Sequence, residues 1–134
     1  MIYLDSCVLL KFIKREAETD ALRSWRQRLP PDTELLTSEL AELEITRALL
    51  RIGVDHERVP YLVDQAVHGV YVADLTSTVL ARAKTYRTAK LGSLDAVHLA
   101  TADPFRGDLT AFVTYDHELA TAARDVGLPT HAPT

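Results

Sequence analysis

The sequence predicts a single α/β domain, residues 1–134, in which helices cover both faces of a mostly parallel sheet. Two observations predict this class. Apolar runs of three or four residues alternate with longer segments whose apolar residues recur at helical spacing. A chain of 134 residues also has room for one hydrophobic core but not comfortably for two. Repeated strand–helix–strand units connect in a right-handed sense, which makes the strands parallel.

Four short apolar runs are the strand candidates. The first opens the chain as Ile-Tyr-Leu at residues 2–4, and the others cover residues 34–37, 70–73 and 111–114. Apart from Glu34, the residues of these runs are apolar or β-branched, which is typical of strands buried on both faces of a sheet. Each run is also followed directly by polar residues that can open a helix.

The segments between these runs carry helix signals. Pro30 and Pro31 end one helix, Ser38 is a good N-cap for the next, and Gly53 has the position of a C-terminal cap. Pro60 is tolerated in a first helical turn. In chain order, the expected helices cover about residues 6–13, 20–29, 39–52, 55–67, 79–83, 94–102 and 119–126, with a loop at 104–108.

Composition excludes several classes of protein. The net charge of −4 argues against a simple electrostatic nucleic-acid-binding module, but not against an enzyme that meets nucleic acid through a metal. The single cysteine, Cys7, excludes an internal disulfide, suits a reducing compartment and is interpreted as a small buried side chain. No apolar run reaches the length of about 18 residues needed to span a membrane, and the N-terminus lacks a signal-peptide pattern. A cytoplasmic protein is expected.

Two acids stand directly after predicted strands. Asp5 follows the first strand and Asp116 follows the last, so that Tyr3-Leu-Asp5-Ser6 is echoed by Thr114-Tyr-Asp116-His117. The carboxyl ends of parallel strands form the edge where open α/β sheets bind ligands. The alternative for Asp5 is that its carboxylate only caps the helix that follows.

Two further acids do not fit a simple core or surface pattern. Asp95 stands in the first turn of a helix that is otherwise small and apolar, where a carboxylate is rare unless paired, metal-bound or bonded to the first amide groups of the helix. Glu44 lies beside an expected apolar seam of the third helix. The alternative is a surface ion pair between Glu44 and Arg47. The residues expected to form this seam are Leu40, Leu43, Arg47 and Leu50.

These four acids, Asp5, Glu44, Asp95 and Asp116, are expected at the same edge of the sheet. Two carboxylates about 4 Å apart repel by roughly 4 kcal/mol at an effective dielectric constant of about 20. Such a cluster stays ionised only with a cation, and all-oxygen ligands favour Mg²⁺ or Mn²⁺ over zinc. One or two such ions can activate water and stabilise phosphoryl displacement.

The same residues carry a resemblance to a known family. The segments Tyr3–Ser6, Glu44–Arg47, Leu94–Ala102 and Val113–Asp116 resemble the PIN-domain family, and more narrowly the VapC toxins of type II toxin–antitoxin systems. The resemblance covers almost the whole chain, and the blocks around Asp95 and Asp116 are specific in combination.

The resemblance implies a three-layer α/β/α sandwich with endoribonuclease activity. Asp5, Glu44, Asp95 and Asp116 would then bind Mg²⁺ or Mn²⁺ and cleave RNA phosphodiester bonds. Ser6 and Thr114 match positions that support the site in this family. For the second acid Glu42 is the alternative, although the Glu-x-x-Arg spacing favours Glu44. The family typically forms homodimers and is silenced by a VapB antitoxin, whose C-terminal segment occupies the toxin's groove.

Three cations of the first helix, Lys11, Lys14 and Arg15, are candidate contacts to RNA phosphates, against the commoner interpretation of a solvated helix end. His98 is interpreted as a packed histidine bonded to backbone rather than a catalytic group. A haloacid-dehalogenase-like phosphatase would need a second Asp where this chain has Cys7. The remaining alternative function is a PIN-like or receiver-like binding module without turnover.

Overall fold

The computed structural model describes all of residues 1–134 and holds one five-stranded sheet. Every neighbouring pair of strands is parallel, in the order β3-β2-β1-β4-β5, which confirms the predicted parallel sheet. The strands are β1 (Ile2–Leu4), β2 (Leu35–Ser38), β3 (Tyr71–Ala73), β4 (Ala111–Val113) and β5 (Thr130–His131).

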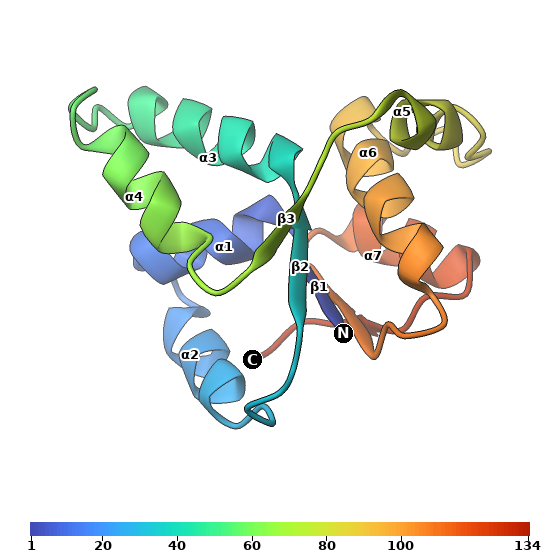
Figure 1. The fold of residues 1–134 in the computed structure, drawn as a ribbon, viewed down its shortest axis with the longest axis horizontal. Coiled ribbons are helices and arrows are strands. Elements are labelled where there is room, and N and C mark those ends of the chain that lie inside the picture. The colour runs from blue at the N-terminus through green and yellow to red at the C-terminus, as the bar shows by residue number, and fades with distance from the viewer.

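Helices form a layer on each side of this sheet, so the fold is the expected three-layer sandwich (Figure 1). One layer contains α1 (Ser6–Ile13), α2 (Thr19–Gln27), α3 (Glu39–Arg51) and α4 (Val59–Ala66). The other contains α5 (Ser77–Ala83), α6 (Ser93–Ala102) and α7 (His117–Asp125), with a 3-10 turn at Asp103–Phe105. No helix combines the length and the apolar character that crossing a membrane requires.

The central strand shows how the sequence builds both halves of the core. Ile2 and Leu4 point into the apolar cluster beneath α1–α4, while Tyr3 points into the cluster beneath α6 and α7. This alternation is the two-residue period of a strand. Tyr3 is fully buried and stacks on Phe112 of the neighbouring strand, with ring centroids 4.9 Å apart. The packing of Tyr3 therefore holds its side chain in place at the centre of the molecule.

The order of the strands creates a crevice at one edge of the sheet. From β1 the chain moves outward to β2 and β3, and it then returns to the other side of β1 to form β4 and β5. The connections after β1 and β4 therefore leave on opposite faces of the sheet, which opens a binding crevice at their carboxyl ends. Asp5 follows β1, and Asp116 lies just beyond β4. The topology alone brings these two acids to one place.

Three local predictions were wrong. The strand β5 was not predicted, because it is only two residues long and polar. The helix expected from residue 55 begins at Val59, since the Asp55 side chain accepts a hydrogen bond from the amide of Glu57 and forms a turn first. The expected seam of α3 was also misplaced: Leu43 is 58% exposed. The buried face of α3 instead consists of Leu40, Ala41, Ile45 and Leu49.

Candidate functional site

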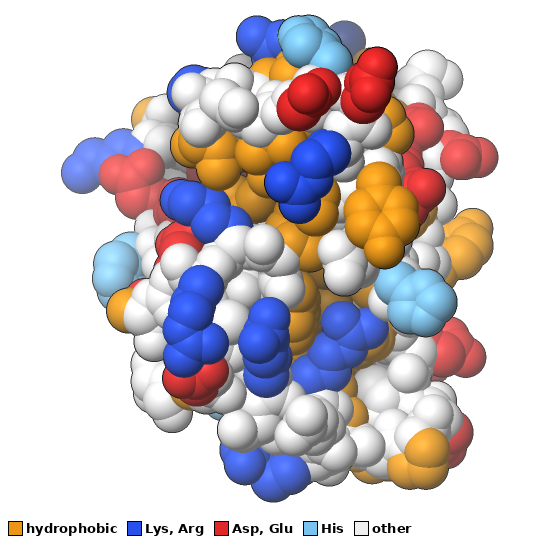
Figure 2. Space-filling view, turned by 90° about the vertical axis from the view of Figure 1, so that its left-hand side faces the viewer, with side chains coloured by type: hydrophobic (Ala, Val, Ile, Leu, Met, Phe, Trp, Pro, Cys, Tyr) orange, Lys and Arg blue, Asp and Glu red, His pale blue; other side chains and the backbone are white.

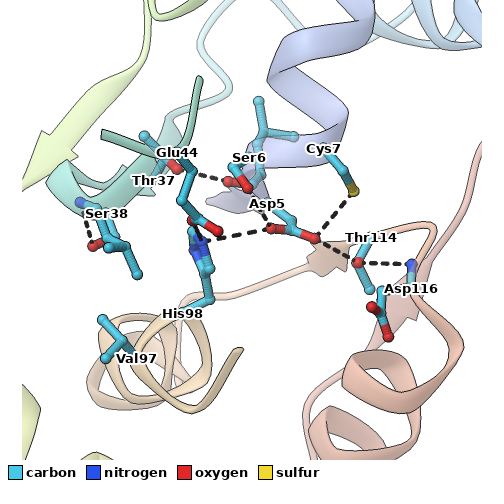
Figure 3. A network of polar contacts seen from close by, with 12 residues as sticks. Asp5, Ser6, Cys7, Thr37, Ser38, Glu44, Val97, His98, Thr114 and Asp116 are labelled. Atoms are coloured by element: carbon cyan, nitrogen blue, oxygen red, sulfur yellow. Dashed lines mark hydrogen bonds and ion pairs between the residues drawn. The ribbon is translucent and has the colours of Figure 1, made fainter. Parts of the chain in front are cut away.

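Asp5 lies at the centre of the crevice and is only 4% exposed. It occupies the N-cap position of α1, but its carboxylate makes no capping hydrogen bond, so the interpretation as a simple cap was wrong. Asp5 Oδ2 instead accepts hydrogen bonds from Thr114 Oγ1 at 2.8 Å and Cys7 Sγ at 3.1 Å, while Oδ1 accepts one from Ser6 Oγ at 3.3 Å (Figure 3). A buried carboxylate with three donors is held rigidly in place.

Thr114 connects Asp5 to Asp116. Its hydroxyl donates to Asp5 and accepts a hydrogen bond from the Asp116 amide at 3.1 Å (Figure 3). The Asp116 carboxylate in turn accepts from the Leu119 amide at 2.9 Å and caps α7. The hydroxyls of Ser6 and Thr114 both lie against the acids, in the supporting positions that the resemblance implies.

Replacing Thr114 with Val should destabilise the fold by about 1.5–3 kcal/mol, because the buried Asp5 carboxylate would lose a charge-assisted donor. Ser6→Ala is the matched control. Its hydrogen bond to Asp5 is longer and only partly buried, so its effect should be smaller. Urea denaturation at neutral pH measures both losses. Equal losses of unfolding free energy in the two variants would show that the Thr114 hydroxyl is not the main donor that stabilises the Asp5 carboxylate.

Glu44 reaches the cluster from α3 and pairs with His98. Glu44 Oε1 lies 2.5 Å from His98 Nε2, which is also 3.6 Å from Asp5 Oδ1 (Figure 3). The alternative ion pair between Glu44 and Arg47 does not form. Of Glu44 and Glu42, only Glu44 makes a polar contact with the cluster.

His98 is packed in the core as the sequence predicted, but the predicted bonds to backbone were wrong. It is fully buried, and its ring bonds to two side chains, Tyr3 and Glu44, rather than to backbone. Burial lowers the pKa of His98, but the hydrogen bond to Glu44 and the charge of Asp5 outweigh burial, so the pKa is raised above its ordinary value. The signal in the sequence was a polar ring three residues after Asp95 on an otherwise apolar helix.

Asp95 is half-buried in the first turn of α6 and accepts no hydrogen bond from the amide groups there. Burial raises its pKa from 3.8 to about 6, and the negative charges of Asp116, Asp5 and Glu44 contribute to the rise. The three other acids therefore all act on Asp95 electrostatically. The structure brings together the four acids that the sequence singled out.

The donor chemistry of this cluster fits a hard divalent cation. Four carboxylates supply only oxygen ligands, and the ionised form of Asp95, which burial and then the neighbouring negative charges disfavour, would be stabilised by a cation. In the conformation described, however, no group of three or more Asp, Glu, His or Cys side chains is arranged so that it could hold an ion. His98 bonds to Oε1 of Glu44 and the Leu119 amide to Oδ1 of Asp116, so the second oxygen of each carboxylate makes no hydrogen bond within the protein.

The cations predicted to contact RNA are engaged with nearby acids. Lys11 is 7% exposed, pairs with Glu16 at 2.7 Å and Glu18 at 3.0 Å, and lies over the ring of Tyr115. This burial corrects the expectation that Lys11 projects from the helix. Lys14 and Arg15 are exposed, but they pair with Glu16 at 3.5 Å and with Asp20 at 2.6 Å, respectively. Their contact with RNA stays a prediction.

A groove of about 620 Å³ adjoins the acids between α1, α3 and the start of α6. Its floor includes Leu10 and Ile45, Leu43 and Leu94 are exposed along it, and Glu44 and Ser6 mark its link to the acid cluster. Arg47 and Arg51 also line it. On the face formed by the α1–α4 layer, Lys and Arg side chains flank exposed hydrophobic surface (Figure 2).

The fold and the acids at its edge define a known class of protein. The family model described as PIN domain matches residues 2–125, so the chain belongs to the PIN-domain family. Within it the chain is of the VapC type. It is 41% identical over 136 residues to ribonuclease VapC47 of Mycobacterium tuberculosis, covering 99% of this chain and 97% of that protein. Ribonuclease VapC35 of the same species is 39% identical over 137 residues, with the same two coverages.

Solved structures share the fold at much lower sequence identity. VapBC2 from Rickettsia felis, bound to a promoter DNA fragment, superposes with a TM-score of 0.75 at 14% identity and covers 100% of both chains. VapC20 of Mycobacterium tuberculosis, a toxin that cleaves the sarcin–ricin loop, superposes with a TM-score of 0.73 at 16% identity, over 91% of this chain and 95% of that one. These likenesses confirm the architecture.

Proposed function

We propose that this protein is a metal-dependent endoribonuclease that acts in the cytoplasm as the toxin of a type II toxin–antitoxin pair. One observation carries the proposal: four acids from separate elements meet at the carboxyl edge of the sheet, in a chain 41% identical to a protein named as a ribonuclease. Acid clusters with perturbed pKa values in a crevice are typical of catalytic sites.

In this proposal Asp5, Glu44, Asp95 and Asp116 hold Mg²⁺ or Mn²⁺. A bound ion of this kind lowers the pKa of water and stabilises charge on a phosphoryl group. The chain itself holds the carboxylates in fixed positions and keeps other groups from binding them. Asp5 is fixed by the hydroxyls of Thr114 and Ser6 and by the Cys7 thiol, whose pKa is raised by burial and by the charge of Asp5. Cys7 is therefore a protonated donor and not a nucleophile.

Cleavage of a mixed RNA pool tests the proposal. The purified chain is incubated with Mg²⁺ or Mn²⁺, with EDTA, and as the Asp95→Asn variant, which controls for contaminating nucleases. Defined fragments that need both the metal and Asp95 would support the nuclease. If wild type and variant cut equally well, or if neither cuts, the catalytic proposal fails and a non-catalytic binding module becomes the better description.

The proposed partner that silences the enzyme is a VapB-type antitoxin. Three of the structural neighbours are toxin–antitoxin complexes: VapBC2 from Rickettsia felis, VapBC-1 from Haemophilus influenzae and a complex from Klebsiella pneumoniae. The groove beside Glu44 suits an antitoxin segment, because its apolar floor can take hydrophobic side chains while Arg47 and Arg51 attract acidic ones. A segment seated there would also close the way to the acids.

The Leu43→Glu variant should lose the antitoxin, because it places a charge in the middle of the apolar groove. Co-purification of the tagged toxin with its cognate antitoxin is the measurement. Thr121→Glu is the matched control, since Thr121 is also exposed but lies on α7 away from the groove. If Leu43→Glu still binds the antitoxin, the antitoxin binds outside this groove.

A homodimer is the proposed assembly. Several large apolar side chains outside the groove are exposed, which is common at subunit interfaces. These side chains are Ile52, Tyr61, Tyr71 and Leu80. Sedimentation equilibrium of the free chain distinguishes a dimer from a monomer.

A further inference from the structure

We infer that His98 is a positioning residue for the second acid of the site: it holds the Glu44 carboxylate ready for the cation, and Tyr3 holds His98. The inference rests on the proposed function, because it assigns Glu44 to the metal. It concerns residues behind the acids, which touch neither RNA nor the ion.

The contacts of His98 form a continuous chain from the core to the site. Tyr3 Oη lies 2.6 Å from His98 Nδ1, and His98 Nε2 lies 2.5 Å from Glu44 Oε1. Tyr3 is itself fixed by stacking on Phe112 within the sheet. Tyr3 and His98 are both fully buried, so neither bond competes with bulk water. Glu44 is thus tied to the buried core at β1, although it stands on a different helix from His98.

The geometry requires a proton on Nε2 of His98. A carboxylate oxygen only accepts hydrogen bonds, so Nε2 at 2.5 Å from Glu44 must be protonated. In the neutral ring, Nδ1 is then an acceptor, and the Tyr3 hydroxyl is the donor that it faces. When the ring carries both protons, the same hydroxyl accepts from Nδ1, so Tyr3 holds the ring in either state while Nε2 donates to Glu44. A phenyl ring at residue 3 would leave Nδ1 without this partner in the core.

A packed core histidine without a role in the site would not need this arrangement. Its polar atoms could bond to the backbone of its own helix, as the Thr101 hydroxyl does to the Val97 carbonyl at 2.7 Å. Both ring nitrogens of His98 instead face side chains from other elements, and Nε2 lies between Glu44 and Asp5. Groups that hydrogen-bond a metal-ligating carboxylate orient it, and losing them typically weakens metal affinity roughly 10–100-fold.

Mn²⁺ binding to the purified chain tests the inference without any RNA. The Kd is measured from the electron paramagnetic resonance signal of free Mn²⁺ for wild type, His98→Leu, His98→Gln and Tyr3→Phe. His98→Leu should weaken binding roughly 10–100-fold. His98→Gln keeps an amide donor for Glu44 and should recover most of the affinity, and Tyr3→Phe should fall between wild type and His98→Leu. Thr101→Val, which removes a buried hydroxyl from the same helix, is the control and should bind like wild type.

Each outcome bears on the inference. Thermal unfolding of each variant shows whether it is folded, and His98→Gln and Tyr3→Phe keep the test open if His98→Leu fails to fold. In the folded variants the KM for RNA should stay at the wild-type value, because a fully buried ring cannot touch RNA. Wild-type or tighter Mn²⁺ binding by His98→Leu and Tyr3→Phe would overturn the inference and leave the nuclease intact. A wild-type chain that binds no Mn²⁺ would overturn the metal-dependent function itself, and the inference with it.

Discussion

Replacing Asp95 with Asn should lower RNA cleavage at least about 100-fold, equivalent to roughly 2.7 kcal/mol of barrier, and should at the same time stabilise the metal-free fold. The two effects have one cause. Asp95 is half-buried beside three other carboxylates, and these surroundings raise its pKa from 3.8 to about 6. The Asp95 carboxylate would therefore help to bind a cation, but without a cation its charge destabilises the fold.

The sign of the stability effect follows from the raised pKa. Below about pH 4 Asp95 is protonated in both the folded and unfolded chain, so it does not weaken the fold. As the pH rises toward 6, the unfolded chain releases its proton first and folding loses stability. The full shift corresponds to about 3 kcal/mol at neutral pH, and screening by solvent around this partly exposed group reduces the expected loss to about 2 kcal/mol. The gain in Asp95→Asn should therefore grow between about pH 4 and pH 6 and then level off.

Urea denaturation in EDTA across this pH range measures the gain, and cleavage of the RNA pool measures the loss. Asp108→Asn is the matched control, because Asp108 is an exposed acid before β4, at the opposite edge of the sheet from the cluster. It should change neither property. If Asp95→Asn is less stable than wild type at neutral pH, Asp95 is a structural acid, and the argument that burial and repulsion disfavour its charge is wrong.

The fold could be predicted from the sequence because the patterns that indicate its strands and helices lie within short segments of the chain. The runs at β1 and β4 are apolar, short and followed at once by polar residues, and parallel strands place such residues at a common edge. The sequence alone therefore predicts that Asp5 and Asp116 lie close together. Asp95 was also identified from its local sequence, because a carboxylate at the start of an apolar helix is unfavourable unless it is paired or bound to a metal.

The contacts that organise the site were not accessible, because they join residues distant in the chain. Glu44 and His98 are 54 residues apart, and Tyr3 and His98 are 95 apart. Periodicity says which face of a helix is buried but not which side chain faces it from another element. The same limit explains Lys11: a cation at a helix end is normally solvated, and its burial depends on how the following turn places Glu16 and Glu18.

Mn²⁺ should raise the thermal stability of wild type strongly and that of Asp95→Asn little. An ion that binds only the folded chain, at about 100 times its Kd, adds about 2.7 kcal/mol, which is about 10 °C in Tm for a domain of this size. The rise should be smaller at pH 5 than at pH 7.5, because protons compete with the cation for Asp95 while the pH is below its pKa of about 6.

Differential scanning calorimetry with Mn²⁺ and with EDTA at both pH values makes the comparison, with Asp108→Asn as the variant that should respond like wild type. A Tm rise of equal size in Asp95→Asn would mean that Mn²⁺ binds elsewhere on the chain. A rise that is larger at pH 5 would contradict competition between protons and the cation. Only the combined result, dependent on Asp95 and greater at the higher pH, fits an ion held by a cluster whose carboxylates repel one another.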